Sequence, residues 1–176
     1  MFVARQRNEI GIFMLIEILC TGDEILTGKT VNTNYSHMAR RFGEVGLTMH
    51  WSTVVGDDRS CLATAFQQAS QRADAVIVNG GLGPTVDDLS QEVAAEAAGV
   101  GLILDENWLS RMLDFYERRG RTMPPNNKKQ AMLPEGAEFI DNPIGTACGF
   151  AINIGLSLIH ISEPTRLRRI WDGLFW

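Results

Sequence analysis

The sequence has few cysteines, no excess of basic over acidic residues and no long apolar run, and each of these features argues against a class of protein. Its three cysteines (Cys20, Cys61 and Cys148) are widely spaced and form no CxxC or Cys/His ligand pattern, and its three histidines are isolated. No zinc site is therefore expected, and we expect the protein in a reducing, cytoplasmic compartment. The formal net charge of -5 argues against a nucleic-acid partner, because phosphate backbones are bound by clustered Lys and Arg.

The two ends of the chain depart from the pattern of the middle. Arg5 and Arg7 precede an apolar run, as in a signal peptide, but Glu17 interrupts the run and roughly ten residues cannot span a bilayer, so no membrane partner is expected. We expect residues 1–13 to be a non-native or disordered extension. Residues 156–176 show no clear element, and SLIHISEPTRLRRI resembles translated adapter sequence, so we expect an artefactual tail there and a domain that covers residues 14–155.

Between these ends, short apolar runs alternate with amphipathic segments. The expected strands are 15–19, 47–55, 75–78, 138–140 and 150–154, and the expected helices are 34–44, 59–72, 88–98, 106–119 and 126–132. The wholly apolar run Ala75–Val78 is typical of a central parallel strand. This alternation predicts one α/β domain with a doubly wound, mostly parallel sheet, whose ligands bind beyond the carboxyl ends of the strands.

The strongest functional signal is GGLGPTVDD at positions 80–88. Gly80, Gly81 and Gly83 let the backbone approach an anion closely, and a helix expected to begin near Asp87 and Asp88 would add its positive end. Two adjacent carboxylates beside a phosphate fit a bridging Mg²⁺. The alternative is a tight turn with an aspartate N-cap, and the dinucleotide fingerprint fails because position 86 is Val.

Three further loops have both a functional and a plain structural interpretation. GDEILTGKT is not a P-loop, because five residues separate its glycines where the motif has four, but it could carry Asp23 into the same cleft or be a surface turn. VVGDD places Asp57 and Asp58 either at a helix N-cap or at a metal or substrate contact. GTACG, with Gly145 and Thr146, fits a ligand contact or a hairpin.

A basic run and a cysteine complete the candidates. Arg118, Arg119, Arg121, Lys128 and Lys129 fit either a solvated face or a lid that supplies cations to phosphates. Cys148 has no obvious histidine partner, so no catalytic thiol is expected.

The motifs TGDEILTG, VNTN, VVGDD, NGGLGPTVDD, PPNNKKQAMLP and NPIGTACGF together resemble the amino-terminal domain of the CinA family. That domain belongs to the molybdopterin-binding superfamily of MogA, MoaB and the gephyrin G domain. The resemblance covers about residues 15–154 and implies a three-layer α/β/α fold that is usually oligomeric, here a dimer or trimer. In the family a proline-glycine loop normally follows the strand at 150–154, but this chain diverges before that loop, so the loop is expected to be missing here. No nicotinamide mononucleotide deamidase domain is expected in this chain.

The resemblance also implies roles for the acids. By motif position, Asp88 and Asp57 match the acids that handle the pterin phosphate in molybdenum-cofactor members, and these are the expected catalytic residues. Gly80, Gly81 and Gly83 match the phosphate loop, and we expect Thr85, Gly145 and Thr146 to contact the ligand with them. CinA-type domains are associated with metal-dependent ADP-ribose pyrophosphatase activity, which suits Asp87, Asp88, Asp58 and Asp23 as ligands of Mg²⁺, Mn²⁺ or Co²⁺.

These inferences lead to one expected function and two alternatives. We expect a hydrolase that cleaves the pyrophosphate of ADP-ribose or a similar dinucleotide with a divalent metal. The first alternative is a module that binds molybdopterin, and the second is a nucleotide sensor that changes oligomeric state without turnover. Each of them takes a small phosphorylated nucleotide or pterin as its partner.

Overall fold

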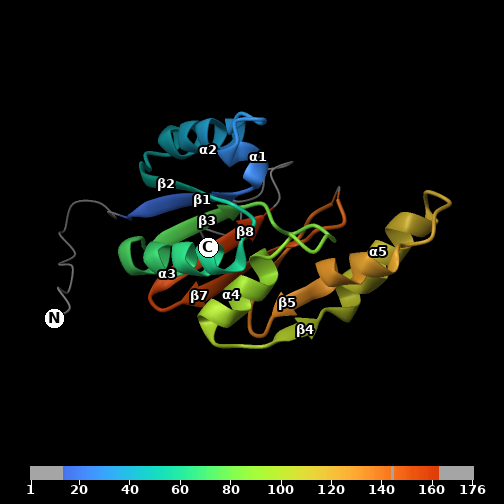
Figure 1. Cartoon of the computed structure of the whole chain (residues 1–176). Helices are drawn as coiled ribbons and strands as arrows, with labels where there is room; N and C mark the ends of the chain where they lie inside the picture. Colours follow the sequence, from blue (N-terminus) through green and yellow to red (C-terminus); the bar gives the residue numbers. More distant parts are fainter. Residues whose placement is uncertain (1–13, 144, 163–176) are drawn as a thin grey trace.

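The computed structural model describes residues 14–143 and 145–162, which form a twisted sheet covered by helices (Figure 1). The elements, in chain order, are β1 (Ile16–Thr21), α1 (Asp23–Leu26), α2 (Thr33–Glu44), β2 (Met49–Val55), α3 (Arg59–Arg72), β3 (Ala75–Asn79), α4 (Ser90–Ala98), β4 (Leu102–Leu104), α5 (Glu106–Glu117), η1 (Pro125–Ala131), β5 (Met132–Pro134), β6 (Glu138–Ile140), β7 (Gly149–Ile154) and β8 (Ser157–Ser162).

The main sheet has six strands in the order β2-β1-β3-β8-β7-β6. The first four of these strands are parallel, whereas β7 runs antiparallel to β8 and β6 antiparallel to β7. This arrangement confirms the predicted doubly wound, mostly parallel sheet. It places the loops that follow β1, β2 and β3 at one edge, where parallel sheets bind their ligands.

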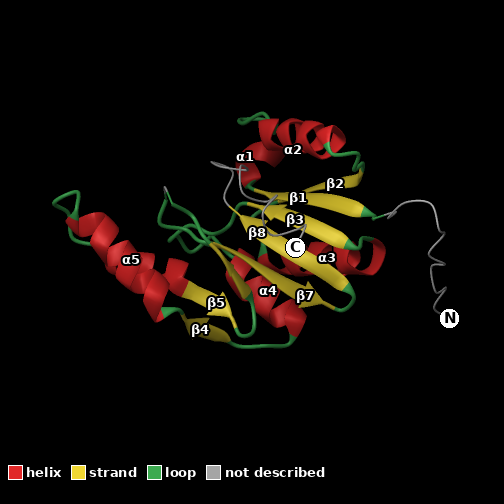
Figure 2. Ribbon diagram, turned by 180° about the vertical axis from the view of Figure 1, so that it is seen from behind, coloured by secondary structure: helices red, strands yellow, loops and turns green. Residues whose placement is uncertain are grey.

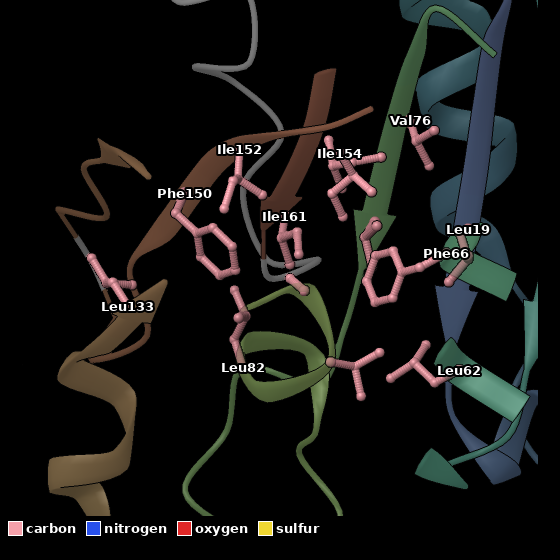
Figure 3. Close-up of a cluster of buried hydrophobic side chains, with 14 of the residues drawn as sticks. Leu19, Leu62, Phe66, Val76, Leu82, Leu133, Phe150, Ile152, Ile154 and Ile161 are labelled. Carbon is pink, nitrogen blue, oxygen red and sulfur yellow. The ribbon is translucent and has the colours of Figure 1, made fainter. Parts of the chain in front are cut away.

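Side chains along each strand point alternately to the two faces of the sheet, and each face carries an apolar layer. Ile16, Ile18 and Cys20 of β1 pack against Met38 and Phe42 of α2 on one face. The other face carries a larger cluster, drawn in Figure 3, in which α3 and α4 contribute side chains that cover the sheet as far as β7; its members include Leu19, Leu62, Phe66, Val76, Leu82, Phe150 and Ile161. Helices on both faces confirm the three-layer α/β/α architecture.

The prediction that no element follows residue 155 is wrong. Ser157–Ser162 forms β8, which lies between β3 and β7 and pairs with both. Ile159 and Ile161 are fully buried against the core, and the Ser157 hydroxyl donates hydrogen bonds to the carbonyl groups of Ser70 and Ala73. This short segment has alternating apolar residues, but a basic stretch follows it directly in the sequence. The composition of that stretch led to the prediction of a tail instead of a strand. Residues 1–13 and 163–176 lie outside the described part of the chain.

A smaller unit extends beyond the far edge of the main sheet. Strands β4 and β5 pair antiparallel, and α5 continues outward from them (Figures 1 and 2). Two strands of three residues each carry too little periodicity to be found in the sequence, and neither was predicted. The TGDEILTG loop contains the short helix α1, and α4 begins at Ser90 rather than near Asp88. Within residues 14–143 and 145–162, no helix is long and apolar enough to cross a membrane.

Candidate functional site

A cavity of about 630 Å³ lies beyond the carboxyl ends of β1 and β3. All the predicted site residues except Asp23 and Asp58 line it: Asp57, Gly80, Gly81, Gly83, Thr85, Asp87, Asp88, Gly145 and Thr146. The sheet topology explains this convergence, because the chain returns to the same edge after each parallel strand.

The glycine loop forms one wall of the cavity with its backbone. Gly80 and Gly81 have φ values of 110° and 74°, a region that side chains rarely adopt. A Cβ atom on Gly80 would lie 2.6 Å from Thr21 Oγ1, and one on Gly83 would collide with the Asp88 carboxylate. Glycine is therefore required by conformation at Gly80 and by space at Gly83, and the wall stays open to a ligand.

Buried polar side chains without partners form the floor. Thr21 and Asn79 end the neighbouring strands β1 and β3 and are only 7% and 4% exposed. Among the described residues, Thr21 Oγ1 and Asn79 Nδ2 have no hydrogen-bond partner, although Asn79 Oδ1 accepts a long bond of 3.5 Å from Asn34 Nδ2. The hydroxyl of Ser162, which pairs with Asn79 across the sheet, is also unpartnered. An unsatisfied buried polar group costs about 1–3 kcal/mol, so this floor is suited to a polar ligand.

The acids on the opposite side repel one another. Asp23 N donates to Asp57 Oδ2 and Asp57 N donates to Asp23 Oδ1, both at 3.2 Å, so the two loops hold each other. Burial raises the pKa of Asp57; the hydrogen bond from Asp23 opposes this rise, and the negative charges of Asp23, Glu24 and Asp87 add to it. Asp57 is therefore the acid in this cluster whose charge the folded protein disfavours.

Asp88 and Asp58 are hydrogen-bonded to neighbouring backbone amides and hydroxyl groups. Asp88 Oδ2 accepts hydrogen bonds from Thr85 N at 2.8 Å and Thr85 Oγ1 at 2.5 Å. Asp58 does not line the cavity and caps α3, because its Oδ1 accepts from Ser60 Oγ at 2.6 Å and Cys61 N at 2.9 Å. These bonds lower the pKa of Asp58 to about 2. Of the two interpretations left open for Asp58, the structure shows the N-cap.

The acids do not assemble into a metal centre. Among the described residues, no group of three or more His, Cys, Asp or Glu side chains could hold a metal ion. Asp58 points to its own helix, and Asp88 is bonded to Thr85. The residues present therefore do not fit the expected metal shell of Asp23, Asp58, Asp87 and Asp88, and we assign no chemical step to a bound ion.

Gln130 of η1 connects the far wall of the cavity to the glycine loop. Its Nε2 donates to the Leu82 carbonyl at 3.2 Å, and its Oε1 accepts from Thr146 Oγ1 at 3.0 Å and Asn127 Nδ2 at 2.9 Å. Asn142 continues this wall, because its Oδ1 accepts from Gly145 N at 3.1 Å. Sequence reasoning assigned no role to Gln130 or Asn142, although both lie in motifs that carry the family resemblance.

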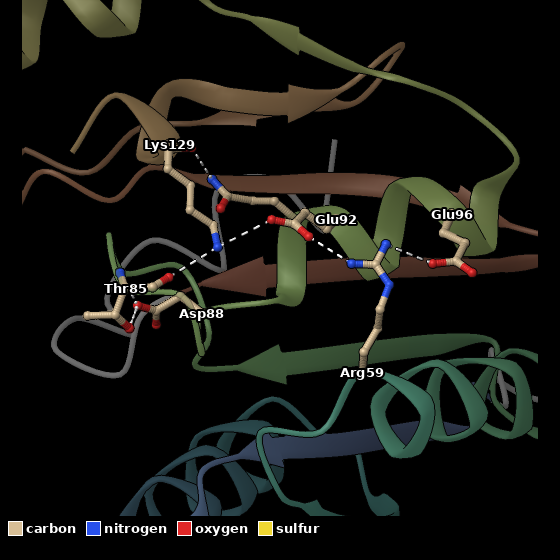
Figure 4. A network of polar contacts seen from close by, with 7 residues as sticks. Arg59, Thr85, Asp88, Glu92, Glu96 and Lys129 are labelled. Atoms are coloured by element: carbon tan, nitrogen blue, oxygen red, sulfur yellow. Dashed lines mark hydrogen bonds and ion pairs between the residues drawn. The ribbon is translucent and has the colours of Figure 1, made fainter. Parts of the chain in front are cut away.

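An ion-pair network fixes the end of the glycine loop (Figure 4). Lys129 Nζ donates to the Thr85 carbonyl at 3.1 Å and pairs with Glu92 Oε1 at 3.3 Å, and Arg59 bridges Glu92 and Glu96 at 2.8 and 3.0 Å. Burial alone would raise the pKa of Glu92, but the bonds from Arg59 and Lys129 hold it below its usual range. Lys129 therefore stabilises the glycine loop and does not line the cavity.

Cys148 has no nucleophilic role in this geometry. It is fully buried, and burial raises the pKa of its thiol to about 12, so the thiolate that attacks a substrate is not formed near neutral pH.

Three comparisons place the chain among known proteins. A family model described as "Probable molybdopterin binding domain" matches residues 17–163. A CinA-like protein from Escherichia coli O9:H4 (strain HS) is 51% identical over 147 residues, which are 84% of this chain and 37% of the relative. The same identity and coverage hold for the NMN amidohydrolase-like protein YfaY of Escherichia coli K12. The chain thus spans just over a third of the length of these relatives.

Solved structures agree with the fold. The crystal structure of a CinA protein of unknown function from Thermoplasma acidophilum has a TM-score of 0.77 and 33% identity, and the match covers 86% of this chain and 89% of that one. The molybdopterin biosynthesis enzyme MoaB from Thermus thermophilus has a TM-score of 0.53 at 17% identity, over 86% and 82% of the two chains, and shows the shared fold alone.

Proposed function

Because the chain belongs to the molybdopterin-binding domain family and is CinA-like, we propose that its cavity binds a small phosphorylated ligand, a nucleotide or a pterin, with a phosphate on the glycine loop. The loop follows the buried strand β3, as in other α/β proteins that bind phosphate with backbone groups.

The observation that carries this proposal is the unpartnered floor. Thr21 Oγ1 and Asn79 Nδ2 are buried hydrogen-bonding groups beside the glycine loop, and a Cβ on Gly80 would lie 2.6 Å from that hydroxyl. A phosphate has several acceptor oxygens and can accept from both side chains at once. The floor and the loop together thus offer donors to one anionic group.

The test of binding is a calorimetric titration of the protein with AMP in buffer that contains EDTA. Asn79→Leu keeps the size of the side chain and removes the donor, so we expect its affinity for AMP to fall by about tenfold or more. Asn107→Leu, on the exposed side of α5, is the matched control and should leave the affinity unchanged. Equal affinities for wild type and Asn79→Leu would remove the basis of the proposal.

We further propose that the bound ligand is ADP-ribose or a similar dinucleotide and that its pyrophosphate is hydrolysed. The acidic side of the cavity supports this, because Asp57 has a raised pKa and can accept a proton from water more readily than an ordinary aspartate. The test incubates the protein with ADP-ribose and Mg²⁺, Mn²⁺ or Co²⁺ and measures the released AMP by chromatography. We expect AMP release that is lost in Asp57→Asn. Because the acids in the described part of the chain form no metal shell of their own, the divalent ion would enter with the pyrophosphate of the ligand, and release should also be lost with chelator.

The same assay separates the alternatives. Binding of AMP and ADP-ribose without AMP release would favour a nucleotide sensor, and light scattering would then show whether the ligand changes the oligomeric state from a dimer or trimer. Retention of a pterin by a protein that binds neither nucleotide would favour the molybdopterin module.

A further inference from the structure

A second cavity of about 500 Å³ opens between α5 and the residues Asn142, Pro143 and Gly145. Its wall carries three guanidinium groups, Arg111, Arg118 and Arg119, and we call it the arginine cavity. In Figures 1 and 2, α5 extends away from the main sheet, so the wall that α5 contributes to this cavity belongs to the outer unit of the fold.

Two of the arginines are held in place and one is free to bind. Arg111 pairs with Asp141 at 2.8 Å and lies 4.9 Å from the centre of the Trp108 ring. Arg119 lies 3.5 Å from the centre of the Phe115 ring and donates to the carbonyl of Phe115 at 3.2 Å. Arg118 has no side-chain partner among residues 14–143 and 145–162. Arg118 and Arg119 thus have no carboxylate partner in the described part of the chain.

The charge of the arginine cavity is opposite to that of the main cavity. Asp114 in its wall and Asp141 on Arg111 offset two of the three guanidinium charges, which leaves one positive charge over. The main cavity is lined by Glu24, Asp57, Asp87 and Asp88, and no Lys or Arg is among the described residues that line it. An anionic ligand that extends from the main cavity into the arginine cavity would therefore meet unpaired positive charge there.

The two cavities are neighbours. Asn142 and Gly145 line both of them, and the bond from Gly145 N to Asn142 Oδ1, at 3.1 Å, keeps this shared wall compact. A ligand with one end in each cavity would have to pass along these two shared residues.

We propose that the arginine cavity binds a second anionic group of the ligand, next to the phosphate that the glycine loop holds; this rests on the proposed function. The chemical class is a nucleoside diphosphate extended at its terminal phosphate, in which the second phosphate accepts hydrogen bonds from Arg118 and Arg119. Guanidinium groups bind phosphate oxygens with paired donors, and the aromatic support of Arg119 limits the freedom that it loses on binding.

The test compares AMP, which has one phosphate, with ADP-ribose, which adds a ribose phosphate to it. Both are titrated by calorimetry in EDTA, so that metal-dependent turnover does not occur. Arg118→Gln with Arg119→Gln should weaken ADP-ribose binding by about tenfold or more and change AMP binding by less than about twofold. Arg40→Gln with Arg121→Gln removes the same charge at exposed positions outside both cavities and should leave both affinities within about twofold.

Each result has one meaning. Unchanged ADP-ribose binding in Arg118→Gln/Arg119→Gln overturns the inference, and so does an equal loss for AMP, which would show a long-range field instead of a contact. If wild type binds AMP normally and ADP-ribose no more tightly, the inference fails while the proposed function stands. If wild type binds neither ligand, the inference fails together with the nucleotide-binding form of the proposed function, and only the pterin alternative is left.

Discussion

The carboxylate of Asp88 accepts two hydrogen bonds from Thr85, at 2.8 Å from its amide and 2.5 Å from its hydroxyl, and occupies the space that a side chain on Gly83 would need. The acid expected to contact a phosphate or a cation is thus also the group that shapes the glycine loop. Loss of ligand affinity in an Asp88 variant can therefore reflect a changed loop as well as a lost contact.

Variants of Asp88 separate these two roles. Asp88→Asn keeps an acceptor for the Thr85 amide, so we expect it to lower the free energy of unfolding by less than about 1 kcal/mol, whereas Asp88→Ala should cost about 1–2 kcal/mol. Urea denaturation gives both values, and Asp87→Asn, an exposed neighbour, should stay within about 0.5 kcal/mol of wild type. AMP affinity that is lost in Asp88→Asn at unchanged stability would show a direct contact instead.

Asp57 should make the protein less stable as its carboxyl group ionises. Its pKa is raised in the folded state, so its favourable contribution is complete below the ordinary value of 3.8 and is lost as the pH rises through the folded pKa. Asp57→Asn keeps an oxygen for the Asp23 amide and removes the repelled charge. We expect a higher melting temperature than wild type at pH 7 and no difference well below pH 3.8. A gain that is independent of pH would contradict this account.

The buried carboxylate of Glu17 depends on Arg72. Glu17 is 0% exposed in β1, and Arg72 at the end of α3 donates to both of its oxygens, at 2.8 and 2.5 Å. Arg72→Ala leaves this charge unpaired, so we expect a loss of about 3–5 kcal/mol in urea denaturation. The double variant Glu17→Met/Arg72→Met should recover most of that loss, because it buries no charge. A double variant as unstable as Arg72→Ala would show that the ion pair itself stabilises the fold, beyond avoiding an unpaired charge.

His160 should lower the free energy of unfolding as the pH falls below 6.5. Burial in β8 lowers the pKa of its ring to about 4, from 6.5 in the unfolded chain. As the pH falls from 6.5 to 4, the unfolded chain gains a proton that the folded protein rejects, so stability present above pH 6.5 is lost across this window. The shift corresponds to about 3 kcal/mol at pH 4. His160→Leu should flatten the difference between urea transitions at pH 7 and pH 4.5, and an unchanged slope would contradict the assignment.

Features that depend on residues close together in the sequence could be predicted. The run Ala75–Val78 is apolar throughout and became the central strand β3, and Asp58 precedes an amphipathic segment and became the N-cap of α3. The convergence of the glycine loop with Asp57 also followed, because parallel strands bring their carboxyl ends to one edge.

Long-range partners explain what the sequence did not predict. Glu17 looked like an interruption of an apolar run until α3 supplied Arg72, which lies 55 residues away. Gln130 joins the glycine loop only because η1 returns to it, although Gln130 lies 48 positions after Leu82 in the sequence. The floor of Thr21 and Asn79 exists because β1 and β3 are neighbours, although β2 comes between them in the chain.

The position of β8 sets the order in which the chain can fold as it is synthesised. Strands β2, β1 and β3 can pair as soon as Asn79 has left the ribosome, and β6 can pair with β7 once Ile154 has. These two parts of the sheet cannot join until β8, the last of the described strands, enters between them. Until then β3 presents an open edge, which is an aggregation hazard for the nascent chain. The rate of sheet closure is therefore set by the arrival of Ser157–Ser162 and its long-range pairing with β3.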